Sequence, residues 1–241
     1  MNHAQFNVAW SQQLLAGLEA GGVRHLVIAP GSRSTPLVLA AIARSGFECH
    51  VQPDERSAAW FALGIGKATG RPAALITTSG TAVANCLPAV VEASQSQVPM
   101  ILLTADRPAE AHACSANQTI DQSGIFGGFV RRAFALEVHE GLGLAVAASI
   151  GLQATDLAGW PLPGPVQINL GFREPLVAET PSEAAPAMDS GFSHPRCLPD
   201  PATLERISSE ISGRAGVLVA GATPLDREAR QALLDLAETL R

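Results

Sequence analysis

Four short polar segments, each placed directly after an apolar run, carry residue types that suit the binding of anions and polar rings. The segments are PGSRS at 30–34, PDE at 53–55, TSGT at 78–81 and ADRP at 105–108. Free main-chain N–H groups and the dipole at the start of a helix attract anions. An arginine side chain adds a planar fork that matches a carboxylate. The segments therefore predict a site for a small anionic or polar molecule.

Two of these segments also have an interpretation that is only structural. Ser32 or Ser34 could cap the helix that follows, beside a solvated Arg33. Residues 78–81 could cap the next helix in the same way. Because helix capping and ligand binding use the same residue types, these segments taken singly leave both interpretations open.

The remaining polar positions are open in the same sense. Arg107 could bind an anion, or it could pair with Asp106. Glu55 stands at the start of a predicted helix, where the dipole stabilises any acid. Asn117 and Gln118 lie in a polar segment that is too long for a simple turn, which weakly indicates a binding loop.

Composition excludes several other kinds of chemistry. The 241 residues contain no tyrosine, so no tyrosine can act as an acid or a nucleophile. Lys67 is the single lysine, so a Schiff base would have to form there. The cysteines form no CxxC pair and the histidines no HxxxH or HxH pair, so no metal site is predicted. Gly64, Gly66 and Gly70 fall late in a predicted helix, in the wrong order for a dinucleotide fingerprint. We interpret them as helix-packing and helix-ending glycines.

Charge and hydropathy limit the partners. The net charge is −6 and no basic run occurs, which argues against a nucleic-acid partner. The N-terminus lacks the features of a signal peptide, and the longest apolar stretch, 142–152, falls short of the ~18 residues of a membrane span. We expect a cytoplasmic protein without a membrane span.

These segments must be positioned by the regular elements between them. Strands are predicted over 23–29, 47–52, 73–78, 100–105, 133–138 and 166–170, and helices over 5–19, 36–44, 55–67, 81–93 and 144–158. Near-continuously apolar strands that alternate with helices are typical of a parallel sheet covered on both faces. The predicted fold class is a doubly wound, mainly parallel α/β sheet. Its strands end at one edge, where ligands bind in such folds.

A second, shorter region follows this sheet. Residues 179–200 are rich in Pro, Ser and Ala and are predicted to form a linker after a first domain at 1–178. Residues 201–241 are predicted to contain a helix to 212, a strand at 216–221 and a helix at 226–240. We interpret them as the truncated start of a second α/β domain.

Five motifs together resemble one enzyme family. They are APGSRSTPL at 29–37, PDER at 53–56, TTSGTAVAN at 77–85, LLTADRP at 102–108 and ANQTI at 116–120. The chain resembles the N-terminal half of the 2-succinyl-5-enolpyruvyl-6-hydroxy-3-cyclohexene-1-carboxylate synthases, enzymes of menaquinone biosynthesis that use thiamine diphosphate (ThDP). The resemblance covers about residues 5–175, and GVLVAG at 216–221 is similar to the start of that family's central domain.

The resemblance implies a pyrimidine-binding (PYR) domain and a transferase reaction. Such an enzyme decarboxylates 2-oxoglutarate and adds the succinyl-semialdehyde unit to isochorismate. Glu55 would hydrogen-bond the aminopyrimidine ring and favour the imino tautomer, which removes the thiazolium C2 proton. By the same resemblance, the cofactor-binding residues are Pro30, Glu55, Thr78, Ser79, Gly80 and Gln118, and the substrate-binding residues are Ser32, Arg33, Arg107, Asn117 and Gln118.

The chain also departs from the family pattern. The GDG element through which ThDP enzymes hold Mg²⁺ and the diphosphate does not occur in these residues. In the family the active site lies between two subunits, so we expect a homodimer or homotetramer and an isolated chain without activity. Two alternatives are another ThDP-dependent decarboxylase or carboligase, and a binding or assembly module without catalysis.

Overall fold

The computed structural model describes residues 2–178, 185–186, 188–195, 198–221 and 227–239. The chain divides into two compact units, Met1–Ser193 and His194–Arg241. The boundary between the units falls inside the predicted linker. Within that linker, residues 179–184, 187 and 196–197 lie outside the described residues.

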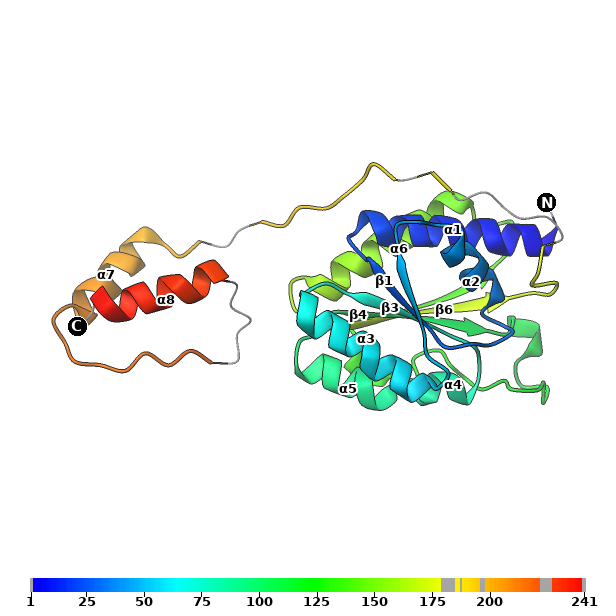
Figure 1. Ribbon diagram of the computed structural model, residues 1–241, viewed down its shortest axis with the longest axis horizontal. Helices are drawn as coiled ribbons and strands as arrows, with labels where there is room; N and C mark the ends of the chain where they lie inside the picture. Colours follow the sequence, from blue (N-terminus) through cyan, green and yellow to red (C-terminus); the bar gives the residue numbers. More distant parts are fainter. Residues whose placement is uncertain (1, 179–184, 187, 196–197, 222–226, 240–241) are drawn as a thin grey trace. The chain divides into compact units, whose positions relative to one another are not determined.

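The first unit is built on a six-stranded parallel sheet in the order β2-β1-β3-β4-β6-β5 (Figure 1). The strands are β1 (His25–Ile28), β2 (Glu48–Val51), β3 (Ala73–Thr77), β4 (Met100–Asp106), β5 (Arg132–Val138) and β6 (Pro165–Phe172). Every residue of β3, β4 and β6 is buried, as expected for parallel strands with both faces covered. The predicted fold class is confirmed.

Helices cover both faces of this sheet (Figure 1). They are α1 (His3–Ala20), α2 (Thr35–Ile42), α3 (Glu55–Thr69), α4 (Thr81–Ala84), α5 (Leu87–Gln95) and α6 (Leu144–Gly159). Helices α1, α2 and α6 pack in one core, around Trp10 and Leu14, and α3 and α5 pack in the other, against Leu75 and Met100. A Cβ at Gly17 of α1 would lie 2.0 Å from the main-chain oxygen of Ala148, so α1 and α6 pack backbone to backbone.

One helix that was predicted as continuous is divided into two helices in the structure. The apolar pattern predicts one helix over 81–93, whereas the structure has α4 and α5 separated at Asn85 and Cys86. Pro88 lies in the first turn of α5, where proline has no N–H to donate to the carbonyl four residues before it. The chain therefore begins a new helix at Leu87.

The register of the sheet aligns the carboxyl ends of its strands. Parallel pairing places Thr77 beside Thr104, and Asp106 beside Gly171. The connection from β4 to β5 has no α-helix; it contains two 3₁₀ turns, Ala109–Ala111 and Gly127–Phe129. The polar segment that contains Gln118 is thus a long loop at this edge.

The second unit contains α7 (Pro201–Ile211) and α8 (Arg227–Thr239). Asp200 caps α7 as expected, since its carboxylate accepts a 2.9 Å hydrogen bond from the Thr203 N–H. The predicted strand at 216–221 is wrong, because these residues pair with no strand and Val217 is 89% exposed. A strand forms only where a neighbour accepts and donates its main-chain hydrogen bonds. Residues 226 and 240, the predicted ends of the last helix, lie outside the described residues.

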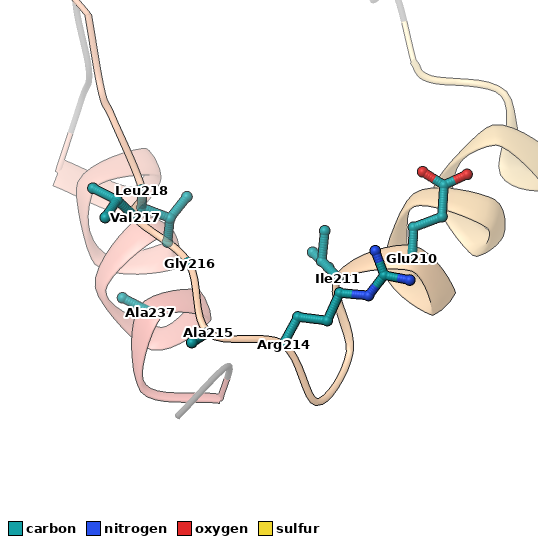
Figure 2. A pocket seen from close by; sticks show the side chains of 8 residues that line it. All are labelled: Glu210, Ile211, Arg214, Ala215, Gly216, Val217, Leu218 and Ala237. Carbon is teal, nitrogen blue, oxygen red and sulfur yellow. The ribbon is translucent and has the colours of Figure 1, made fainter.

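A hollow of about 520 Å³ in this second unit lies between α7, the extended residues 214–218 and α8 (Figure 2). Apolar side chains such as Ile211 and Leu218 make up much of its lining. Neither α7 nor α8 has a buried residue among those described. None of the helices described in either unit meets the length and hydropathy needed to cross a bilayer.

Candidate functional site

A pocket of about 450 Å³ opens at the carboxyl edge of the sheet. Its lining comes from the residues that follow β1, β2, β3, β4 and β6 and from the long loop between β4 and β5. The lining residues are Pro30, Gly31, Ser32, Arg33, Glu55, Thr78, Arg107, Gln118 and Glu174. Most of the residues that the sequence singled out thus meet in one pocket.

Three predicted residues do not line this pocket. Ser79 is fully buried and its hydroxyl donates a 3.1 Å hydrogen bond to the main-chain oxygen of Gln118. Gly80 is buried next to Gln118, whose Cγ would lie 2.9 Å from a Cβ at Gly80. Asn117 is exposed on the loop. Ser79 and Gly80 therefore support the lining from behind, whereas Asn117 lies outside it.

The segments after β1 and β3 touch directly. A Cβ at Gly31 would lie 2.2 Å from the Cβ of Thr78, which leaves no space for a side chain at this position. The helix that follows, α2, begins without a side-chain cap, because the Ser34 hydroxyl donates to the main-chain oxygen of Gly31 at 2.9 Å. The capping interpretation is therefore wrong for Ser34. The serine instead tightens the turn that presents Arg33.

Arg33 is held by the carboxyl end of β6 and the segment that follows it. Its guanidinium donates to the main-chain oxygen of Phe172, the last residue of β6, at 3.0 Å and to Glu174 Oε1 at 2.8 Å. The side chain is only 11% exposed, whereas that of Glu174 is 71% exposed. The guanidinium is thus held at the pocket in one orientation, and its carboxylate partner remains in contact with solvent.

Arg107 also lines the pocket. Its guanidinium donates to the Ser79 hydroxyl and, at 2.8 Å, to the main-chain oxygen of Gln118. The Asp106 carboxylate accepts the main-chain N–H of Arg107 at 2.8 Å, whereas the guanidinium makes its hydrogen bonds to Ser79 and Gln118. Of the two alternatives left open for Arg107, a pair between its side chain and that of Asp106 is not formed. Burial, and then repulsion from Arg33, lower the pKa of Arg107. A bound carboxylate would offset both costs, which makes this pocket suited to an anion.

A network of buried polar side chains supports the pocket from within the sheet. Asn169 donates to Asp106 Oδ2 at 2.8 Å and accepts from Gln122 Nε2 at 2.8 Å. The side-chain oxygen of Gln122 in turn accepts the Gly80 N–H at 2.7 Å. Burial raises the pKa of the Asp106 carboxyl, against the lowering effect of its hydrogen bonds. The network ties β4 and β6 to the turn after β3.

Glu55 enters the pocket from the first turn of α3. The Asp54 carboxylate caps this helix by accepting the Ser57 N–H at 2.7 Å, and that hydrogen bond lowers the pKa of Asp54. Glu55 itself is half-buried. Behind it, burial and then the charges of Glu55 and Asp54 raise the pKa of the Cys86 thiol to about 12. Cys86 is therefore a protonated packing residue and not a nucleophile.

Several members of this site were not predicted from the sequence. Glu174 follows β6 at the same edge as the other segments, so the strand-end rule could have found it. Gln167 and Asn169 interrupt the otherwise apolar strand β6, which was the available signal for a buried polar network. Gln122 has no such signal, because only the fold of the long loop brings it under Gly80.

The polar groups that line the pocket suit one end of a polar aromatic ring ligand. A half-buried carboxyl, a hydroxyl and an amide, from Glu55, Thr78 and Gln118, lie beside the apolar ring of Pro30. These groups can hold ring nitrogens and an amino group by hydrogen bonds. Glu174 is the other acid in the lining, and it is paired with Arg33.

Comparison with known families agrees with this arrangement. The family model described as thiamine pyrophosphate enzyme, N-terminal TPP binding domain, matches residues 9–125. This range includes β1 to β4 and the polar segments that follow them. The fold, the strand-end pocket and the match define the chain as the N-terminal TPP-binding region of a thiamine pyrophosphate enzyme.

Curated relatives give the particular family. A 2-succinyl-5-enolpyruvyl-6-hydroxy-3-cyclohexene-1-carboxylate synthase from Dechloromonas aromatica is 45% identical over 98% of this chain and 44% of its own length. Synthases of the same name from Chlorobium phaeobacteroides and Sorangium cellulosum are 40% and 47% identical, over 100% and 73% of this chain and 44% and 29% of their own lengths. The chain belongs to this synthase family. It spans less than half the length of these relatives.

Proposed function

We propose that this chain provides the pyrimidine-binding part of the active site of a 2-succinyl-5-enolpyruvyl-6-hydroxy-3-cyclohexene-1-carboxylate synthase. The observation that carries the proposal is the pocket in which Glu55 of α3 lies together with Arg33 and Arg107. It combines one carboxyl group for a ring ligand with two arginines for acidic substrates.

The cofactor proposed for this pocket is ThDP, held at its aminopyrimidine end. Bound ThDP supplies the electron sink that allows a 2-oxo acid to lose CO₂. Glu55 is proposed to hydrogen-bond a ring nitrogen, with its proton held between the carboxyl oxygen and that nitrogen. Pro30, Thr78 and Gln118 complete the lining around the ring. The buried turn of Ser79 and Gly80 keeps Thr78 and Gln118 in place.

The proposed substrates are 2-oxoglutarate and isochorismate, both of which are dicarboxylates. Arg33 and Arg107 are proposed to bind their carboxylates, because a planar guanidinium forms charge-assisted hydrogen bonds of about 1.5–3 kcal/mol. Ser32 lies beside Arg33 in the lining and can add a hydroxyl donor. Asn117, exposed on the loop, is proposed to reach substrate only when the rest of the site is present.

Mg²⁺ is also proposed for the complete enzyme, at a site outside this chain. The pocket lining offers Glu55 and the paired Glu174 as its acids, and the GDG element does not occur in the sequence. We therefore propose that the chain by itself does not bind ThDP tightly and does not catalyse.

Association of two or four chains is part of the same proposal. Trp60 and Phe61, on the helix that starts at Glu55, are 40% and 41% exposed. Large aromatic side chains of this kind are common at protein interfaces. We propose a homodimer or homotetramer, which light scattering would identify. The expected cytoplasmic location stays a prediction.

The decisive experiment measures CO₂ release from 2-oxoglutarate with ThDP and Mg²⁺ present. We expect no release with the isolated 241-residue chain, and turnover with the complete synthase that contains it. Release by the isolated chain would contradict the division of the site. A complete protein that consumes 2-oxoglutarate but prefers another acceptor would be a different ThDP-dependent carboligase, and one without turnover would be a binding or assembly module.

A further inference from the structure

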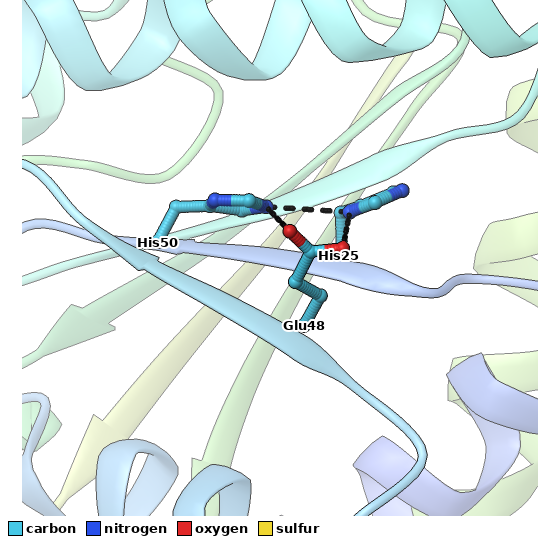
Figure 3. A group of neighbouring side chains, drawn as sticks. All are labelled: His25, Glu48 and His50. Atoms are coloured by element: carbon cyan, nitrogen blue, oxygen red, sulfur yellow. Dashed lines mark hydrogen bonds and ion pairs between the residues drawn. The ribbon is translucent and has the colours of Figure 1, made fainter.

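His25, Glu48 and His50 meet on one face of the sheet, away from the pocket (Figure 3). His25 begins β1 and Glu48 begins β2. The parallel register pairs His25 with Glu48 and Val27 with His50. Residues two apart in a strand point to the same face, so all three side chains lie together. Spacing along the chain did not predict this group, because its members come from two strands.

The three side chains point their polar atoms at one another. His25 Nδ1 lies 3.3 Å from His50 Nε2 and 3.6 Å from Glu48 Oε2, and His50 Nε2 lies 3.7 Å from Glu48 Oε1. A tetrahedral zinc site with bonds of about 2.0–2.2 Å has ligand–ligand separations of about 3.3–3.6 Å. The two distances to Glu48 run to its two different oxygens, and one ligand atom from each residue lies within 4.8 Å of the other two. A small rotation of the exposed Glu48 side chain would bring one oxygen to the third corner of such a site.

The surroundings hold the ligands but leave the site accessible. The His50 ring makes an edge contact with the ring of Phe61 of α3, with 5.1 Å between the ring centroids. The imidazole rings of His25 and His50 stack, with 5.5 Å between their centroids. The histidine side chains are 29% and 21% exposed, and that of Glu48 is 67% exposed. Solvent can therefore reach the fourth corner, where a water molecule would complete the coordination of a three-ligand site.

We infer that His25, Glu48 and His50 form a binding site for a divalent transition-metal ion, and that the bound ion is Zn²⁺. Two imidazole nitrogens and one carboxylate suit zinc, whereas Mg²⁺ and Ca²⁺ prefer oxygen ligands alone. The site lies at the amino end of β1, and the pocket residues Pro30–Arg33 follow its carboxyl end. In the described sheet β2 pairs with β1 alone, so the ion would fasten an edge strand.

The test uses the 241-residue chain, stripped with a chelator and titrated with ZnCl₂ against a chromophoric zinc indicator. We expect one tightly bound Zn²⁺ per chain, undisturbed by a large excess of Mg²⁺. His25→Gln, Glu48→Gln and His50→Gln should each weaken binding by at least about tenfold, because even outer-shell changes cost that much. Zn²⁺ should also raise the melting temperature of the unmodified chain.

Two matched variants exclude other surface ligands. His139→Gln removes an exposed histidine elsewhere, and Cys49→Ser removes the exposed thiol between Glu48 and His50, on the opposite face of β2. Both should bind Zn²⁺ as the unmodified chain does. The inference would be overturned if the unmodified chain did not bind Zn²⁺, or if the three ligand variants bound it as tightly as the unmodified chain does. Loss of Zn²⁺ binding in Cys49→Ser would overturn it as well.

X-ray absorption at the zinc edge on the unmodified chain keeps the test independent of variant folding. It should show imidazole and oxygen ligands without sulfur. A spectrum without imidazole ligands, or with a sulfur ligand, would equally overturn the site.

Discussion

Arg107 donates a 2.8 Å hydrogen bond from its guanidinium to the main-chain oxygen of Gln118. Gln118 has a φ of +54°, a left-handed conformation that is costly for a residue with a side chain. Its amide donates back to the main-chain oxygen of Ser79 at 2.9 Å. Arg107 thus fixes the loop conformation that presents Gln118 to the pocket, in addition to any role with substrate.

Arg107→Ala should therefore loosen this loop even in the isolated chain. Without the guanidinium, Gln118 can relax from its left-handed conformation, and hydrogen exchange in peptides covering 114–122 should accelerate. The measurement is exchange followed by mass spectrometry, with Arg71→Ala as an exposed arginine control. Unchanged exchange in the Arg107 variant would show that the loop keeps its conformation without the Arg107 guanidinium.

Arg33→Ala should act mainly on substrate binding. The guanidinium is anchored by Phe172 and Glu174, so its loss removes a positioned cation without freeing the long loop. In the complete synthase we expect the apparent KM for one carboxylate substrate to rise by roughly tenfold or more, the value of one charge-assisted hydrogen bond. Steady-state kinetics with each substrate varied in turn would identify which one. Unaltered KM values for both would make Arg33 a structural residue.

Glu55→Gln should abolish most of the turnover of the complete synthase. A positioned proton-transfer group contributes about 10²–10⁴-fold to a rate, and glutamine cannot exchange a proton with a ring nitrogen. Because Glu55 is half-buried at the first turn of α3, the melting temperature should change little. Glu92→Gln, on α5, serves as the control. Retained turnover in the Glu55 variant would remove the catalytic assignment.

The buried Asp106 predicts an unusual dependence of stability on pH. Burial raises its folded-state pKa above the ordinary value of 3.8, so between these two pKa values the folded state binds more protons than the unfolded state. The contribution of Asp106 to stability therefore falls as pH rises through this window. Urea unfolding across acidic pH should show this decline in the unmodified chain and not in Asp106→Asn. Parallel pH profiles of the two proteins would contradict it.

Two glycines of α3 offer a matched pair for testing helix packing. A Cβ at Gly66 would lie 2.5 Å from the main-chain oxygen of Pro99, whereas a Cβ at Gly64 would have no atom within 4 Å. Gly66→Ala should destabilise the fold by about 1–3 kcal/mol, and Gly64→Ala should stabilise it by up to about 1 kcal/mol. Urea unfolding measures both. Equal effects would mean that α3 shifts to accommodate either methyl group.

The same glycines show what local pattern can and cannot reveal. The packing interpretation is confirmed for Gly66, and the helix-ending one for Gly70, which has a φ of +67° at the end of α3. It is wrong for Gly64, whose surroundings are open. A glycine in the sequence shows that another segment could pack closely against the helix at that position. It does not show on which side of the helix that segment lies.

The strand-end pocket was predictable because apolar strands and the polar residues after them are both local signals. Arg33, Glu55, Thr78 and Arg107 converge for that reason alone. The hydrogen bonds of Gln122 and Asn169, and the meeting of His25 with His50, depend on loop path and strand register. The spacing of residues along a single helix or strand predicts neither these hydrogen bonds nor the meeting of the two histidines. For the same reason, the apolar run at 216–221 resembles a strand but pairs with none.

All residues of the pocket lining fall between Pro30 and Glu174, inside the first compact unit. The arginines, Glu55 and the buried amides behind them are therefore encoded by one uninterrupted stretch of sequence. A single recombination event can transfer this whole edge to another chain with its internal hydrogen bonds preserved. The lining residues of this edge can thus be inherited as one block, provided that α1, which packs on α6 from outside this stretch, is inherited with it.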